Sequence, residues 1–237
     1  MLLELQDICF TRDNRKILDK VSLEIDIQNF IAITGPIGSG KSTLVKIIMG
    51  IEEPDSGKII FDGQDITNMS IDERARIGMS FAFQQPVKFK GITVYDLLKI
   101  AAKKDITKME ACEVLSQVGL CAKEYVDREV NGSLSGGELK RIEIANVVLR
   151  EAKLTIFDEP EAGIDLWSFN NLIQVFENMS KLVKGTTIII SHQERILNIA
   201  DEVILMKNGK INKIGTSEEI LKEEIANKAC CKMEVGN

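Results

Sequence analysis

The pattern of hydrophobic and polar residues changes its period several times along the chain. Apolar and polar residues alternate at 3–6 and again at 21–25, a period that predicts half-buried β-strands. The continuous apolar segment 31–34 runs into Gly35 and predicts a buried strand. Apolar residues at helical spacing follow over 41–49. The chain therefore begins with strands that lead into a helix, which is typical of an α/β domain.

The middle of the chain lacks strand patterns. Segments 94–103 and 108–120 have helical spacing, so we predict a helical subdomain inserted at about 86–150. After it, strands and helices alternate again, with further elements predicted at 137–149, 154–158, 166–182, 186–191 and 193–199.

The C-terminal part ends in a predicted hairpin and helix. Asn208 and Gly209 stand between two short strand-like segments, which is the strongest short sequence signal for a β-hairpin. A helix is predicted over 217–226. We expect one domain over residues 1–227 and a polar tail over 228–237.

Composition narrows the classes of function. The net charge of −6 disfavours binding to nucleic acid or to an anionic membrane surface. No apolar segment approaches the roughly 18 residues that span a bilayer, so we expect no direct membrane insertion. The N-terminus leads straight into a strand pattern, so we expect no signal peptide, and the five cysteines lack metal-ligand spacing. These features predict a cytoplasmic protein with reduced thiols.

A glycine-rich loop lies between the strand at 31–34 and the helix at 41–49. Such a loop cradles phosphates with inward-facing N–H groups, and the helix N-terminus adds its positive dipole end. We expect Lys41 to reach the β- and γ-phosphate oxygens of ATP and Ser42 to ligate Mg²⁺. The G-x-x-x-x-G-K-[ST] motif consists of Gly35, Pro36, Ile37, Gly38, Ser39, Gly40, Lys41 and Ser42, and we include Thr43 in the site.

Two carboxylates end the hydrophobic strand predicted at 154–158. We expect Asp158 to hold Mg²⁺ through its water shell. Glu159 faces differently and is the candidate general base that polarises the attacking water. Following a phosphate loop, this strand end predicts the catalytic edge of a nucleotide site.

Two further polar side chains also lie at strand ends. His192, the only histidine, follows the strand predicted at 186–191 and is a candidate contact of the γ-phosphate or the attacking water. A lone histidine is more often structural, and its place in the order of motifs favours function here. Gln84 ends the strand at 79–83 and is a candidate contact of Mg²⁺ or the lytic water.

A second phosphate cradle lies at Leu134–Glu138. Ser135, Gly136 and Gly137 begin a helix, where backbone N–H groups suit a bound phosphate. Since one nucleotide needs only one such cradle, the second one predicts that two copies face each other and that each copy completes the site of the other.

The ordered set of motifs resembles the ATP-binding-cassette (ABC) ATPases over residues 1–225. The resemblance implies a P-loop fold with a RecA-like core, an N-terminal antiparallel β subdomain and an inserted helical subdomain. It also implies an ATP-induced, head-to-tail homodimer, in which Asp165 couples the two sites. An aromatic residue that stacks on adenine is expected in this family. Phe10 is the candidate, although Arg12 lies nearer the usual position, and Ile37 replaces the more usual Asn.

A finer resemblance links the chain to the SufC-type ATPases of iron–sulfur cluster assembly. It depends on SGGELKR at Ser135–Arg141, DEPEAGIDLWSF at Asp158–Phe169 and FQQPVKFKGITV at Phe83–Val94. Transporter ATPases usually have Gln where Glu138 stands. The resemblance implies a soluble SufB-type scaffold as the partner, docked on the helical subdomain near Gln85–Gly91. Two alternatives are the nucleotide-binding subunit of a membrane ABC transporter and a nucleic-acid-associated ABC protein, which the acidic charge disfavours.

Overall fold

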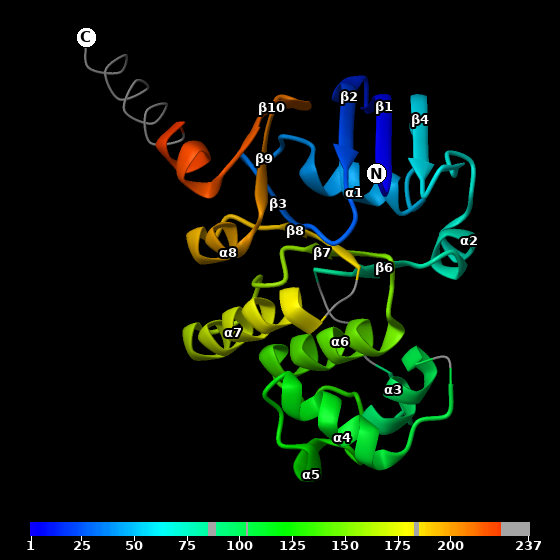
Figure 1. Cartoon of the computed structure of the whole chain (residues 1–237), viewed down its shortest axis with the longest axis vertical. Coiled ribbons are helices and arrows are strands. Elements are labelled where there is room, and N and C mark those ends of the chain that lie inside the picture. The colour runs from blue at the N-terminus through cyan, green and yellow to red at the C-terminus, as the bar shows by residue number, and fades with distance from the viewer. Residues whose placement is uncertain (85–88, 103, 183–184, 224–237) are drawn as a thin grey trace. The chain divides into compact units, whose positions relative to one another are not determined.

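The computed structural model describes residues 1–84, 89–102, 104–182 and 185–223 (Figure 1). The tail predicted at 228–237 and Gln85–Lys88 of the predicted docking segment lie outside these residues. The chain forms two compact units. The first unit combines Met1–Ser70 with the part of the chain from Ile190 onward, and the second unit is Ile71–Ile189.

An antiparallel sheet of four strands forms much of the first unit, in the order β2-β1-β4-β5. Leu3 pairs with Ile25 and Leu5 with Leu23, and these side chains are buried because alternate residues share one face of the sheet. The strands are β1 (Leu3–Arg12), β2 (Arg15–Ile25), β4 (Ser56–Phe61) and β5 (Gln64–Asp65). The two strands predicted from alternation at 3–6 and 21–25 are thus confirmed.

The described part of the first unit also contains three strands and two helices that lie beside the predicted phosphate loop or His192. β3 is buried along its whole length and runs parallel to β9, which pairs with β10 in an antiparallel hairpin. Asn208 and Gly209 form the turn of this hairpin with φ of 50° and 74°, as a two-residue turn of this kind requires. The elements are β3 (Phe30–Thr34), α1 (Lys41–Ile48), α8 (Glu194–Ile199), β9 (Glu202–Lys207) and β10 (Lys210–Gly215).

The second unit contains a group of helices and three strands in the order β8-β7-β6. β6 and β7 are parallel, with Ala82 opposite Phe157, and α6 packs against α3, α4 and α7. The elements are α2 (Ile71–Arg76), β6 (Met79–Ala82), α3 (Val94–Ala102), α4 (Lys108–Gln117), α5 (Ala122–Tyr125), α6 (Gly136–Arg150), β7 (Leu154–Asp158), α7 (Leu166–Leu182) and β8 (Thr186–Ile190).

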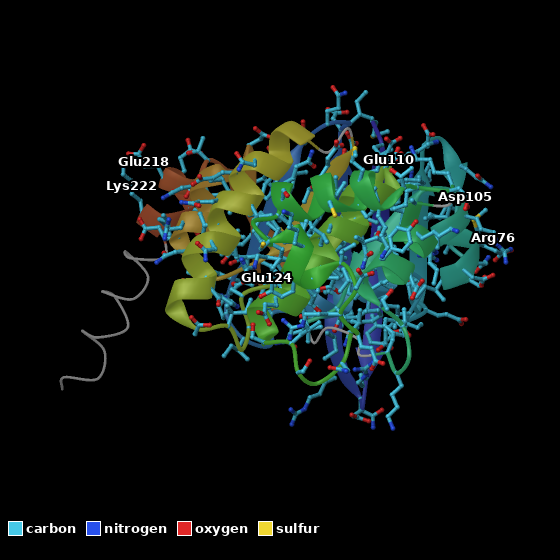
Figure 2. The ribbon with its side chains drawn as sticks, turned by 90° about the horizontal axis from the view of Figure 1, so that it is seen from below. Arg76, Asp105, Glu110, Glu124, Glu218 and Lys222 are labelled. Atoms are coloured by element: carbon cyan, nitrogen blue, oxygen red, sulfur yellow. The ribbon has the colours of Figure 1, made fainter. Side chains whose placement is uncertain are left out.

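The predicted helix at 108–120 ends earlier than its pattern. α4 stops at Gln117 because Gly119 takes a φ of 72°, the left-handed conformation that ends many helices. Its start is fixed by Thr107 and Glu110, which form a capping box with the backbone. The charged residues labelled in Figure 2 are all exposed: Arg76, Asp105, Glu110, Glu124, Glu218 and Lys222.

Candidate active site

The phosphate loop of the first unit is packed so tightly that two of its positions accept only glycine. A Cβ at Gly35 would lie 2.0 Å from the carbonyl oxygen of Met206, and one at Gly40 would lie 2.9 Å from that of Ile17. Both glycines also have positive φ, at 137° and 98°. The loop shape is therefore set by the backbone of β2 and β9.

The β9–β10 turn holds this loop from outside. The Gly209 N–H donates to the Ser39 carbonyl oxygen at 3.1 Å, and the Asp19 N–H donates to the Gly209 carbonyl oxygen at 2.9 Å. Hydrogen bonds from Lys16 and Lys210 lower the pKa of the Asp19 carboxyl to about 2. The hairpin predicted at Asn208-Gly209 is thus part of the support of the phosphate loop.

Lys41 lies inside the loop rather than in solvent. Its side chain is buried, and Nζ donates to the carbonyl oxygens of Gly35 at 2.7 Å and Pro36 at 3.0 Å. Gly40 precedes α1 and has no side chain that could cap it, so the helix N-terminus suits a bound anion. Ile37 is 97% exposed and points away from the loop. The donors present here fit a phosphate chain.

His192 belongs to the same unit as the phosphate loop. The preceding Ser191 is buried and its N–H donates to the Ile33 carbonyl oxygen at 3.2 Å, which ties this segment to β3. The His192 side chain is exposed. Phe10 is buried on β1 with the Arg12 guanidinium 5.4 Å from its ring centre, and Arg12 is also bonded to Glu52. The exposed planar group at this position is therefore Arg12, and the adenine-stacking role of Phe10 stays a prediction.

In the second unit, the candidate general base Glu159 is hydrogen-bonded to Gln84. Gln84 Nε2 donates to Glu159 Oε2 at 3.0 Å. The contact follows from strand pairing, because both residues leave the ends of the parallel neighbours β6 and β7. Glu159 has a φ of 45°, a conformation that costs energy in a non-glycine residue and often marks functional sites. Asp158 is buried at the end of β7.

The second cradle is a complete capping box at the start of α6. The Glu138 N–H donates to Ser135 Oγ at 3.2 Å, and the Ser135 N–H donates to Glu138 Oε2 at 2.6 Å. Ser135 Oγ thus accepts a hydrogen bond from the helix backbone, and the residue is exposed at the start of α6. Burial opposes the charge of Glu138, but hydrogen bonds from Tyr125 and Ser135 outweigh it and lower the pKa of this carboxyl.

Asp165 lies close to this cradle through the start of α7. It accepts a hydrogen bond at 3.0 Å from the N–H of Ser168. A Cβ at Gly137 would lie 2.7 Å from the Ser168 Cβ, so glycine at this position permits α6 and α7 to touch. The structure therefore brings two of the predicted motifs together within the second unit.

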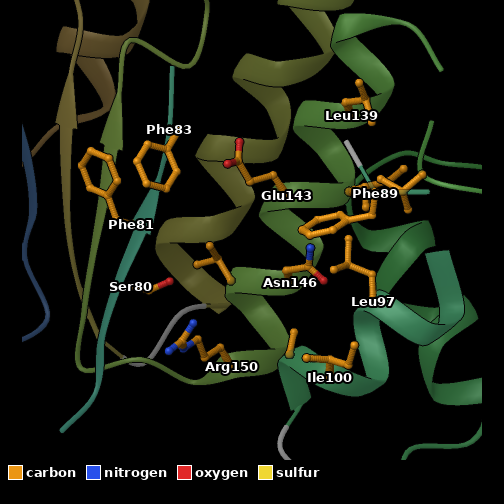
Figure 3. Close-up of a pocket in the computed structure, with 14 residues that line it drawn as sticks. Ser80, Phe81, Phe83, Phe89, Leu97, Ile100, Leu139, Glu143, Asn146 and Arg150 are labelled. Atoms are coloured by element: carbon orange, nitrogen blue, oxygen red, sulfur yellow. The ribbon is translucent and has the colours of Figure 1, made fainter. Parts of the chain in front are cut away.

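An apolar cavity of about 430 Å³ also lies in this unit (Figure 3). The sequence pattern does not predict this cavity, since it depends on tertiary packing. Three of its polar residues, Glu143, Asn146 and Arg150, share one face of α6, at a spacing of three and four residues. Asn146 Oδ1 and Arg150 Nε are buried and find no hydrogen-bond partner among the described residues. The apolar walls come mainly from β6, α3 and α6, with Phe81, Phe83, Phe89, Leu97, Ile100, Leu139 and Ile142.

A strand, a phosphate loop and a helix in this arrangement define a P-loop nucleotide-binding protein. A family model described as "ABC transporter" matches residues 18–162, more than half of the 237 residues, and the chain belongs to this family. It is therefore an ATPase of the ABC type that uses ATP and Mg²⁺. The expected P-loop ABC ATPase fold is confirmed.

Known relatives carry transporter names. An uncharacterized ABC transporter ATP-binding protein of Methanocaldococcus jannaschii is 42% identical over 229 residues, which cover 93% of this chain and 91% of that protein. A probable ATP-dependent transporter, ycf16, of Pyropia yezoensis is 36% identical, with 91% of both chains covered. The spermidine/putrescine import ATP-binding protein PotA of Mesoplasma florum is 33% identical over 94% of this chain, but over only 63% of its own length.

Solved structures of ATP-binding cassettes have the same fold as this chain. The ADP conformation of an ATP-binding cassette of an ABC transporter superposes with a TM-score of 0.80 at 30% identity, covering 100% of this chain and 99% of that chain. A dimeric post-hydrolysis cassette bound to ADP and Pi has a TM-score of 0.77 at 21% identity, covering 91% of this chain and 99% of that chain. Within the described residues, no helix is both long enough and apolar enough to cross a bilayer.

Proposed function

We propose that the chain is the ATP-hydrolysing subunit of a membrane ABC transporter and works on the cytoplasmic side. The proposal is supported by relatives whose names describe transporter proteins, and one of these relatives is 42% identical over nearly the whole chain. The observation that carries the proposal is the Gln84–Glu159 hydrogen bond. Glu159 is the candidate general base, and Gln84 directly follows Phe83, which lines the apolar cavity. A partner bound in that cavity would therefore contact the same segment that holds the general base.

The proposed roles follow the chemistry of each side chain. Lys41 binds the β- and γ-phosphate oxygens, and Glu159 polarises the attacking water. His192 contacts the γ-phosphate or that water. Ser42, Asp158 and Gln84 are the residues that would hold Mg²⁺, which would supply positive charge to offset that of the phosphates.

We also propose that ATP closes two copies of the chain into a homodimer. Ser135, Gly136 and Gly137 of one copy bind the γ-phosphate that is held by the phosphate loop of the other. The exposed position of Ser135 and the N-terminus of α6 are the supporting observations. Asp165, adjoining α6, couples the two sites.

The partner docks at the apolar cavity. Its shape suits an apolar segment that also brings a hydrogen-bond donor for Asn146 and an acceptor for Arg150. Ile100 lines the cavity and is 66% exposed. Ile100→Glu should reduce partner-stimulated ATPase activity and leave basal activity unchanged. Met109→Glu, at a 74% exposed position on α4 outside the cavity, is the matched control.

A second candidate is the ATPase of iron–sulfur cluster assembly, with a SufB-type scaffold as partner. Glu138, held by Tyr125, and the segment Glu161-Ala162-Gly163 favour it. Purification of the tagged chain from its native cells separates the two candidates. A partner with apolar spans that stimulates the ATPase supports the transporter. A soluble partner that does so supports the assembly protein and contradicts the transporter.

A further inference from the structure

Lys140 is a buried cation in the middle of the second unit. Its side chain is 2% exposed, although an ammonium group is costly to remove from water. Nζ donates to the carbonyl oxygen of Phe83 and to Glu143 Oε2, the latter at 2.8 Å. Lys140 therefore joins helix α6 to the segment that follows strand β6.

The Phe83 carbonyl lies where the sheet stops holding the chain. Pairing between β6 and β7 ends at Ala82 and Phe157, one residue before Phe83. The next residue, Gln84, is exposed and donates to Glu159. The position of Gln84 thus depends on whatever fixes the Phe83 carbonyl, and the structure shows Lys140 bound there.

The ion pair alone does not account for this arrangement. A buried pair repays its desolvation poorly, and apolar residues of similar volume often give equal or better stability. Desolvation outweighs the attraction of Lys140 and raises the pKa of the Glu143 carboxyl, so the pair is not an efficient source of stability. The carbonyl contact is the feature that an apolar replacement would lose.

We infer that Lys140 is a positioning residue for ATP hydrolysis, which acts through the Phe83 carbonyl to hold Gln84 against Glu159. The inference rests on the roles proposed above for Gln84 and Glu159. Nothing in it involves the phosphate loop, which belongs to the other unit. Loss of Lys140 should therefore slow the chemical step and leave ATP binding in place.

Steady-state ATPase kinetics of the full chain with Lys140→Met test this. We expect kcat to fall by about 10- to 100-fold, since small displacements of catalytic groups have effects of that size, with KM for ATP unchanged. Lys140→Arg keeps the charge and the donors and should recover most of kcat. The matched control is Ile144→Ala, a fully buried position of the same helix whose side chain has no group that could hydrogen-bond the Phe83 carbonyl. It should lower Tm without changing kcat of the folded protein.

Other results would overturn the inference. A wild-type kcat in folded Lys140→Met would show that the residue does not affect hydrolysis. An equal loss of kcat in Lys140→Met and Ile144→Ala would indicate a merely structural role. If Lys140→Met does not fold, Glu143→Leu removes the carboxylate that pairs with the ammonium and that also accepts a hydrogen bond from the Phe83 backbone, and unchanged kcat there overturns the inference equally.

Glu159→Gln separates this inference from the proposed function. If that variant hydrolyses ATP normally, the roles of Glu159 and Gln84 are wrong. If it is inactive while Lys140→Met is fully active, only the role of Lys140 is wrong.

Discussion

Tyr125 donates its hydroxyl to the carboxylate of Glu138, three residues after the serine of the second cradle. The contact fixes the Glu138 carboxylate in the capping box, beside Ser135 and the site that is expected to bind phosphate. We expect Tyr125→Phe to lower the free energy of unfolding by about 1 kcal/mol, as for the loss of one hydrogen bond, and to weaken the ATP-induced dimer.

The same contact has a defined pH dependence. The pKa of Glu138 is lowered in the folded protein, so its contribution to stability is present above the unfolded pKa and is lost as the pH falls through the folded value. The difference between wild type and Tyr125→Phe should shrink in acid, as measured by denaturant unfolding. Tyr95→Phe, which loses a hydrogen bond to the Ile106 carbonyl, is the control that should leave dimerisation intact. An equal loss of dimer in both variants would contradict the role of Tyr125.

Glu159→Gln should bind ATP, fail to release phosphate and accumulate as a dimer. The amide keeps an oxygen that Gln84 can reach but is not a base, so only the chemical step is lost. Phosphate release and light scattering measure the two effects. Glu151→Gln is a close control, because Glu151 is exposed and shares the φ of 45°. Near wild-type turnover in Glu159→Gln would exclude this residue as the general base.

Ser135→Arg should bind nucleotide as a monomer and fail to close. The long cation would replace the small Ser135 hydroxyl and fill the space in front of the α6 N-terminus. Equilibrium binding of a fluorescent ATP analogue and size-exclusion chromatography with ATP report the two steps separately. Ser133→Arg, at an exposed position just before the cradle, should dimerise normally. An unaffected ATP-induced dimer in Ser135→Arg would contradict the paired-cradle proposal.

Gly35→Ala should be far more harmful than its small size suggests. The new Cβ would lie 2.0 Å from the Met206 carbonyl oxygen, and the phosphate loop or β9 would have to move. Gly63→Ala is the comparison, since Gly63 also has positive φ but open space around its Cβ position. A left-handed residue alone costs about 1–2 kcal/mol. Thermal unfolding should show a clearly larger loss for Gly35→Ala, and equal losses would mean that the loop is not braced by β9.

Asp19 gives a second pH-dependent prediction. Its pKa is about 2 in the folded protein, lowered mainly by hydrogen bonds from Lys16 and Lys210. The ionised Asp19 carboxylate therefore stabilises the folded protein fully at pH values above the ordinary pKa of a carboxyl group. This stabilisation is lost as the pH falls toward 2. Asp19→Asn should be less stable than wild type at neutral pH and equal to it near that acid limit. A difference that persists in acid would show that packing, not charge, is responsible.

The sequence predicts local features of this protein well. The glycine spacing before Lys41, the alternation in β1 and the Asn208-Gly209 turn each depend on neighbouring residues, and each is found at the expected place. The end of α4 was predicted too late because apolar spacing continues past Gly119, whose backbone conformation ends the helix.

Contacts between distant segments could not be predicted in the same way. Lys140 reads as an ordinary surface residue of a signature helix, and only the fold places it against Phe83, 57 positions earlier. Phe10 matches an aromatic requirement in the sequence, and only the fold shows that its ring is buried with the Arg12 guanidinium 5.4 Å from its centre. No sequence motif points to Tyr125, since its hydrogen bond to Glu138 depends on how the fold places the two residues.

The turn at Asn208-Gly209 has a practical consequence for anyone who modifies this chain. Hairpin tips are usual places for inserted tags or reporter domains. Here the Gly209 backbone bonds both Ser39 and Asp19, so an insertion would pull on the phosphate loop itself. The tip at Asp62-Gly63, with open space around Gly63, is the better site for an epitope or a fluorophore.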